Sequence, residues 1–80
     1  MAAVPTSEQN ARLILEMFVK RFDRKPGQVL RQKNFNGVMH EFGINSSDFS
    51  LGLQFAIKRG WIESLEINVY TMTEDGFAQV

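Results

Sequence analysis

Residues 43–62 have the sequence GINSSDFSLGLQFAIKRGWI, and this stretch decides the fold. Gly43 suits the left-handed position that ends one helix, and Ser46 is a favoured N-cap for the next. The apolar residues that follow recur at the spacing of one buried helix face: Phe49, Leu53, Ala56 and Ile57. Gly60 then stops the pattern. The stretch therefore predicts a tight turn followed by a helix over residues 47–59.

Two further helices are predicted upstream of this turn. The first covers residues 7–22, with Thr6 and Gln9 forming a capping box. Its buried stripe is Ala11, Ile14, Leu15, Phe18 and Phe22. The second covers residues 31–42, with Phe35, Val38, Met39 and Phe42 on one face. Gly37 weakens this second helix and predicts a close contact with another helix.

The apolar period changes downstream of Gly60. Residues 61–67 and 69–73 are rich in aromatic and β-branched side chains and predict two strands, joined by a turn at Asn68. Thr73 is a plausible cap for a short helical turn after them. Residues 28–30 are a candidate short extended segment. The expected fold is therefore α+β, with a three-helix core and a C-terminal two-stranded β-hairpin.

Length and composition favour one small globular domain. The chain has 80 residues, of which 44% are hydrophobic and 22% are charged. We expect a flexible N-terminal arm over residues 1–6 and a folded domain over residues 7–80. The chain has no Cys, which excludes disulfides and thiolate zinc sites. Neither a signal-peptide pattern nor a membrane-spanning apolar run is present, so we expect a cytoplasmic protein.

The inventory of reactive side chains argues against an enzyme. His40 is the one histidine and lies off the stripe of its predicted helix, which favours a solvated position. Serine and threonine side chains have no other base to activate them, and the glycines form no phosphate-binding loop. We therefore expect no catalytic residue, no metal site and no cofactor.

Two local motifs carry a resemblance to a known superfamily. The segment AIKRGWI, residues 56–62, resembles a recognition helix that enters the first strand of a wing. The segment YTMTEDGFA, residues 70–78, resembles the exit from the second wing strand. Over residues 7–78 the chain resembles the winged helix-turn-helix superfamily, in its small bacterial form. The resemblance implies that the hairpin is a wing, and Trp61 is the expected anchor of its junction with the third helix.

The resemblance implies a DNA-binding module, such as a transcriptional regulator, with helix 47–59 in the major groove. Helical stepping puts one set of side chains on its outer face as candidate base readers: Ser47, Ser50, Leu51, Gln54 and Lys58. Net charge is zero, yet residues 1–33 hold seven basic and three acidic side chains. The candidate phosphate contacts come from this basic part: Lys20, Arg21, Arg24, Lys25, Arg31 and Lys33. A solvated charged corner explains the same cluster equally well.

An alternative is a winged helix that binds a protein partner. Glu63 and Glu66 make the predicted wing acidic, which is unfavourable for phosphate contact. Leu51 and Phe55 point away from the core stripe of helix 47–59 and would form an apolar interface. A homodimer is also expected if DNA is the target, and its candidate contacts on the first helix are Leu13 and Met17.

Overall fold

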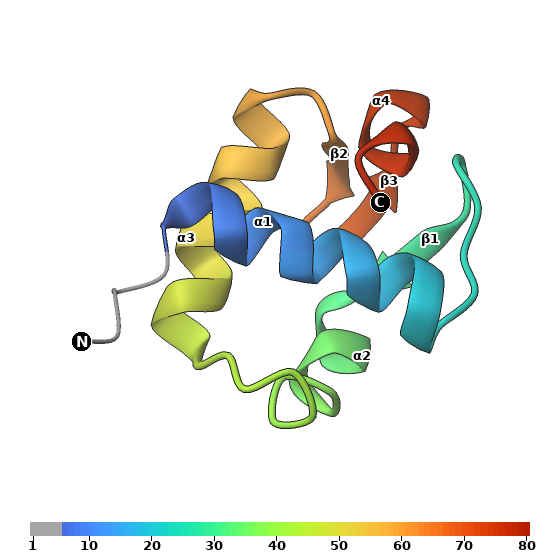
Figure 1. The fold of residues 1–80 in the computed structure, drawn as a ribbon. Helices are drawn as coiled ribbons and strands as arrows, with labels where there is room; N and C mark the ends of the chain where they lie inside the picture. Colours follow the sequence, from blue (N-terminus) through green and yellow to red (C-terminus); the bar gives the residue numbers. More distant parts are fainter. Residues whose placement is uncertain (1–5) are drawn as a thin grey trace.

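A computed structural model describes residues 6–80, so the predicted N-terminal arm lies outside the described residues except for Thr6. The elements follow one another along the chain as α1 (Ser7–Glu16), η1 (Met17–Arg21), β1 (Val29–Arg31), α2 (Gln32–Asn36), α3 (Ser46–Lys58), β2 (Ile62–Glu66), β3 (Val69–Met72) and α4 (Glu74–Ala78) (Figure 1). The fold is α+β, as expected. Within the described part, no helix has the length and apolarity needed to cross a membrane.

The first helix begins as predicted and ends differently. Thr6 caps α1 through the expected capping box with Gln9. The α-helix stops at Glu16 and continues as the π-helical turn η1, where the Phe22 amide donates to the Met17 carbonyl at 3.0 Å. In this wider turn the successive side chains of Met17 and Phe18 are both fully buried. The helix thus buries a broader face than one α-helical stripe.

The predicted helix over residues 31–42 is wrong in length. Only α2, Gln32–Asn36, is helical, and residues 37–43 form turns. Gly37 at its C-cap favours this early end, because glycine is a poor helix former. The close helix contact expected at Gly37 is also wrong, since a Cβ there would meet only the Asn34 carbonyl, at 3.8 Å. Phe35 is nevertheless fully buried as predicted, and Gly43 has the expected positive φ of 66°.

The third helix packs across the first at very close range. A Cβ on Gly52 would lie 2.7 Å from the Asn10 carbonyl carbon and 2.8 Å from the Ala11 nitrogen. The N-cap is Asn45 rather than Ser46, since the Asn45 side chain accepts from the Asp48 amide at 2.8 Å. The predicted inward position of Ile57 is wrong: this side chain is 38% exposed. The contact with α1 centres on the Gly52 side of the helix, which leaves Ile57 at its edge.

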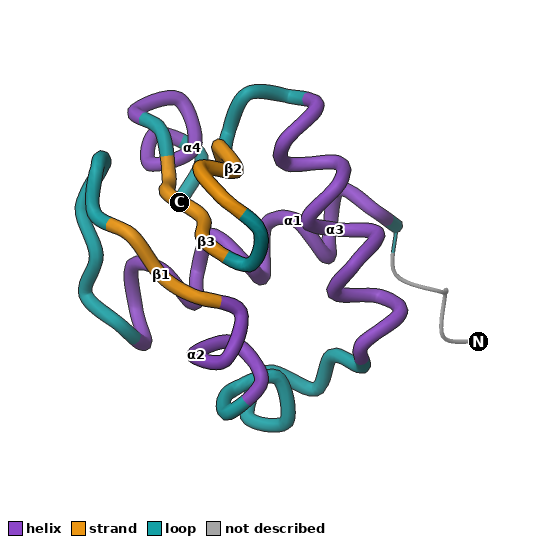
Figure 2. Tube along the Cα trace, turned by 180° about the vertical axis from the view of Figure 1, so that it is seen from behind, coloured by secondary structure: helices purple, strands orange, loops and turns teal. Residues whose placement is uncertain are grey.

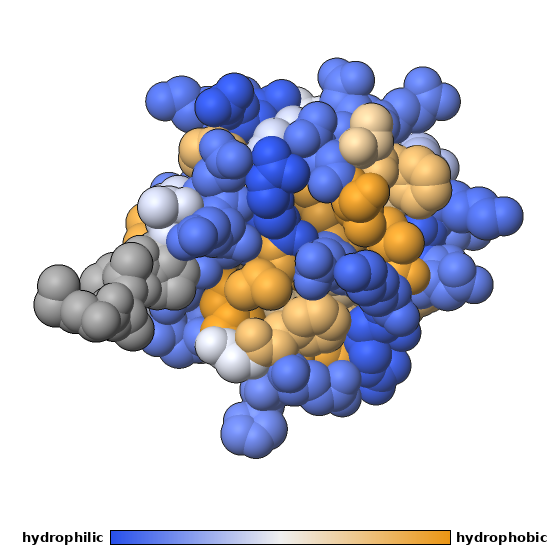
Figure 3. Space-filling model, in the orientation of Figure 1, coloured by the Kyte–Doolittle hydropathy of each residue, from blue (hydrophilic) through white to orange (hydrophobic). Residues whose placement is uncertain are grey.

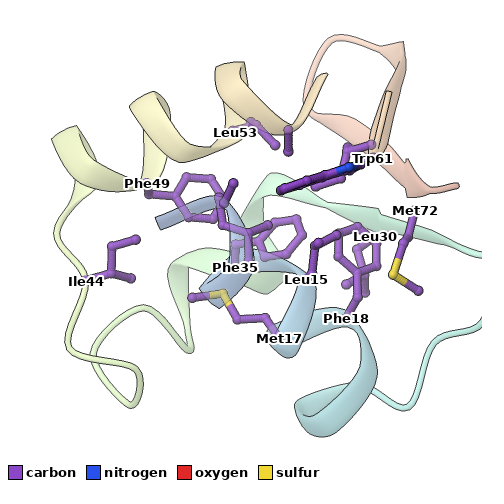
Figure 4. Close-up of a cluster of buried hydrophobic side chains, with 14 of the residues drawn as sticks. Leu15, Met17, Phe18, Leu30, Phe35, Ile44, Phe49, Leu53, Trp61 and Met72 are labelled. Carbon is purple, nitrogen blue, oxygen red and sulfur yellow. The ribbon is translucent and has the colours of Figure 1, made fainter. Parts of the chain in front are cut away.

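The sheet has three antiparallel strands rather than the two expected, in the order β1-β3-β2 (Figure 2). The predicted pairing of the last two strands is present as the β2–β3 hairpin, with Asn68 at a φ of 64° in its turn. The segment considered extended at residues 28–30 joins the sheet as β1, which pairs Val29 with Thr71. Leu30 and Met72 point from this sheet into the core, where both are almost fully buried (Figure 4).

The C-terminal helix closes the fold over Trp61. Trp61 is 8% exposed and lies between α3 and β2, in the anchoring position that its sequence context predicts. Thr73 caps α4 as expected, by accepting from the Gly76 amide. Arg12 lies 5.2 Å from the centroid of the Trp61 ring and donates to Gln79 at 3.3 Å. The end of the chain is thereby tied to α1.

The crossing of α1 and α3 is testable with two glycine variants. Gly52→Ala places a methyl group against the backbone of Asn10 and Ala11, and overpacking of this kind costs about 1–3 kcal/mol. The matched control Gly37→Ala has free space and a right-handed backbone, so it should stabilise the protein by about 0.4–1 kcal/mol. Urea denaturation measures the free energy of unfolding of both variants. Equal effects of the two substitutions would contradict the close contact of α1 and α3 at Gly52.

Candidate nucleic-acid interface

The outer face of α3 is open to solvent along its length. All five side chains predicted as base readers are exposed: Ser47, Ser50, Leu51, Gln54 and Lys58. Within residues 6–80, the polar members of this set take no part in a side-chain hydrogen bond or ion pair. The fold therefore leaves their donors and acceptors available to a ligand.

The apolar pair on the same helix is less free than the sequence suggests. Leu51 is 51% exposed, whereas Phe55 is half-buried. The centroid of the Phe55 ring lies 5.7 Å from that of Trp61. The Arg59 guanidinium covers Phe55 from 5.1 Å. Phe55 thus supports the junction of α3 with the sheet, and of this pair only Leu51 is exposed.

The predicted dimer contacts on the first helix are only partly at the surface. Met17 is fully buried in the core, so it is unavailable to a second copy, which corrects the expectation from sequence (Figure 4). Leu13 is half-buried against the same core. On the α1 side of the molecule, apolar side chains reach the surface in patches separated by polar ones (Figure 3).

The predicted basic cluster divides into two groups in space. Four members lie in η1 and the loop after it, on the opposite side of the molecule from α3 (Figures 1 and 2): Lys20, Arg21, Arg24 and Lys25. Lys20 pairs with Glu16 at 3.8 Å, and Arg21 pairs with Glu41 at 3.0 Å. The Arg24 side chain is half-buried, with its Nε enclosed. This group is therefore partly neutralised and remote from α3.

The other two basic residues lie beside the hairpin turn. Arg31 ends β1 and Lys33 lies in the first turn of α2, and both are exposed. In the described part of the chain, neither has a carboxylate within 4.0 Å. A hollow separates them from the turn of the hairpin, and its opposite wall includes Ile67 and Asn68. The Gln32 amide donates to the Asn68 carbonyl at 2.8 Å and joins the two walls.

The two acidic side chains of β2 line two different hollows. Glu66 lines the hollow beside Arg31, and Glu63 faces a second hollow that also includes Gly27 and Glu74. The pairing of β1 with β3 brings these acidic positions next to the basic early part of the chain. The charge separation along the sequence therefore does not persist as two separate poles on the surface.

Sequence reasoning missed the hollow beside the hairpin turn. Gln32, Asn36 and Ile67 contribute to it, and none was predicted as a site residue. The sequence carries no signal for this hollow, because Asn68 supplies the positive φ of the turn and the position before it accepts most side chains. His40 is exposed as expected. Across residues 6–80, no three His, Cys, Asp or Glu side chains are grouped closely enough to hold a metal ion.

The two faces of α3 should respond differently to truncation. Gln54→Ala and Lys58→Ala remove side chains without described partners, so each should change the free energy of unfolding by less than about 0.5 kcal/mol. Leu53→Ala on the buried face should cost about 2–5 kcal/mol. Denaturation followed by Trp61 fluorescence measures the free energy of unfolding of each variant. A large loss of stability in Gln54→Ala would show that the outer face contributes to folding.

No protein-family model, curated protein or solved structure matches this chain at a significant level. Its function is therefore inferred from the residues and the geometry described above.

Proposed function

We propose that the chain is a DNA-binding protein of the winged helix type, with α3 as the helix that enters the major groove. The order of the elements supports this assignment, because β1 follows the first helix and the β2–β3 hairpin follows α3. The strand order β1-β3-β2 is compatible with it, since the hairpin pairs with the strand that follows the first helix. Such a module would act in transcriptional regulation.

The free outer face of α3 is the observation that carries this proposal. Its polar side chains are exposed and have no side-chain partner among residues 6–80, so they are available to contact bases. A helix of this kind fits the major groove, which is about 12 Å wide. Gln54 is suited to adenine and Lys58 to guanine or phosphate, while Leu51 can contact a thymine methyl group.

Phosphate contacts come from Arg31 and Lys33 in this proposal. Both are exposed and without a carboxylate partner in the described chain, unlike Lys20 and Arg21. Two such contacts and zero net charge give weak attraction for one copy. Two copies bound to paired half-sites would make twice as many phosphate contacts, so the proposal includes a homodimer. Leu13 is its candidate contact, because Met17 is buried.

The alternative of a protein-binding winged helix has less support. It depends on Leu51 and Phe55 as one apolar surface, and Phe55 is partly engaged by Trp61 and Arg59. Exposed acidic residues on β2 remain compatible with a basic protein partner. Salt dependence separates the two functions, because counterion release accompanies phosphate binding and not apolar contact.

The proposal predicts which cations determine the salt dependence of DNA binding. Affinity for a short mixed-sequence duplex, measured by fluorescence anisotropy at several salt concentrations, should fall as salt rises, with a logarithmic slope of about −1.8 for the two phosphate contacts of one copy. Arg31→Gln and Lys33→Gln should each reduce the logarithmic slope by about 0.9, the value for one lost phosphate contact. Lys20→Gln is the matched control, because Lys20 is paired with Glu16 and lies on the far side of the molecule.

Gln54→Ala should leave that slope unchanged and alter the preference among duplex sequences, since base contacts specify and phosphate contacts position. If Lys20→Gln weakens binding as much as Lys33→Gln, the assigned interface is wrong. If the wild-type protein has no measurable affinity for duplex DNA at low salt, the DNA-binding function itself is wrong.

A further inference from the structure

Asn36 is followed by glycine, the residue that leaves an asparagine side chain most open to attack by its own backbone. Among the asparagines of the chain, only Asn36 precedes a glycine. Without a Cβ, the glycine nitrogen can closely approach the side-chain carbonyl carbon of the preceding residue. Neither backbone conformation nor packing requires glycine at this position. Gly37 has a φ of −74°, and a Cβ on it would meet only the Asn34 carbonyl, at 3.8 Å.

The structure leaves this pair accessible to water and weakly held. Asn36 and Gly37 are both exposed, and Asn36 is the last residue of α2. The Gly37 amide donates to the Phe35 carbonyl and so lacks the α-helical bond to the Lys33 carbonyl. A helix of five residues is not stable by itself, so its last residue can leave the helical conformation at low cost. The Gly37 nitrogen is therefore able to turn towards the Asn36 side chain.

The other asparagines are protected by their surroundings. Asn45 precedes a small serine, but its side chain caps α3 by accepting from a backbone amide of that helix at 2.8 Å. Asn10 is buried within α1. Asn34 and Asn68 precede phenylalanine and valine, whose side chains crowd the attacking nitrogen. Asn36 is thus the asparagine that sequence and structure both leave reactive.

Gln32 favours addition of a nucleophile to the Asn36 side chain. Its Nε2 donates to the Asn36 Oδ1 at 3.2 Å, from one helical turn earlier. A donor on this oxygen draws electron density from the carbonyl carbon. It also stabilises the negative charge that develops on the oxygen when a nucleophile adds. The neighbour on the same helix face therefore activates the carbonyl group that Gly37 would attack.

Asn36 lies beside the two cations assigned to phosphate contact. It lines the hollow at the hairpin turn together with Arg31, Lys33 and Glu66. These two cations and one carboxylate leave the hollow with a net positive charge. Lys33 lies three residues before Asn36, a spacing at which side chains meet on a helix. A carboxylate at position 36 would pair with Lys33 and bring the charge of the hollow to zero.

We propose that Asn36 deamidates spontaneously in the folded protein and that the product neutralises Lys33. The Gly37 nitrogen forms a bond to Asn36 Cγ and loses its proton. The Cγ–Nδ2 bond breaks, and Nδ2 takes up that proton and leaves as ammonia. Water then opens the cyclic imide at either carbonyl carbon, which gives aspartate or isoaspartate. The reaction is independent of the proposed DNA-binding function, whereas its consequence, a loss of DNA affinity as the molecule ages, rests on that function.

The reaction is measured on the intact chain during incubation at neutral and mildly alkaline pH. Fragment-ion mass spectrometry locates the exchange of an amide for a carboxyl group, and chromatography separates the aspartyl and isoaspartyl products. Asn36 should convert in the folded protein at a rate that rises with pH, because the attacking nitrogen must lose its proton. Asn45 is the internal control and should stay intact until urea unfolds the chain and removes its contact with α3.

Three variants test the mechanism and the effect on charge. Gly37→Ala should retain the fold and slow the conversion of Asn36, because its methyl group obstructs the nitrogen. Asn36→Asp carries the charge of the product, and Asn36→Gln is its neutral control. Asn36→Asp should reduce the logarithmic slope of DNA affinity against salt by about 0.9, the value for one phosphate contact, and Asn36→Gln should not. Without DNA, the side-chain NMR resonances of Lys33 should shift in Asn36→Asp, whereas those of Lys58 should not.

The outcomes distinguish the reaction from the function. If Asn36 converts no faster than Asn45 in the folded protein, or as fast in Gly37→Ala as in the wild type, the modification site is wrong. If the Lys33 resonances stay in place in Asn36→Asp, the neutralisation of the hollow is wrong. The same follows if wild-type protein binds DNA and the two Asn36 variants have equal slopes. Absence of wild-type DNA binding overturns the proposed function and the loss of affinity, while the mass and NMR measurements still decide the site and its charge effect.

Discussion

At Gly52 the backbone of α3 comes so close to Asn10 and Ala11 that no side chain fits between the two helices. This contact sets the rotation of α3 about its own axis, because any other rotation would place a larger side chain in the same space. The buried side then continues through Phe49, Leu53 and Ala56. The opposite side therefore faces solvent.

Phe35 connects this helix pair to the remaining elements. Its ring makes aromatic contacts with centroid distances of 5.1–6.4 Å to four residues, which come from η1 and its C-cap, from α3 and from β3: Phe18, Phe22, Phe49 and Tyr70. A helix of five residues is too short to be stable alone, so α2 is held in place by this one side chain and by its bond to the hairpin turn. Packing of Phe35 therefore positions Arg31 and Lys33 at the hollow.

The features predicted correctly from the sequence are those set by local interactions. The capping box at Thr6, the cap at Thr73 and the hairpin turn at Asn68 depend on neighbouring residues. The outer face of α3 was predictable for the same reason, because helical periodicity fixes the exposed side once the buried side is known. The third strand and the division of the basic cluster depend on distant packing.

The division of the basic cluster limits how much electrostatic attraction can contribute to the proposed binding of DNA. The β1–β3 pairing interleaves the basic early chain with acidic positions such as Glu63 and Glu74, and Glu41 neutralises Arg21. A surface without a large cationic field attracts DNA weakly at long range, so steering is a small part of association. If the proposed function is right, recognition of DNA comes from short-range contacts. The exposed side chains of α3 would supply them under the proposed DNA-binding function.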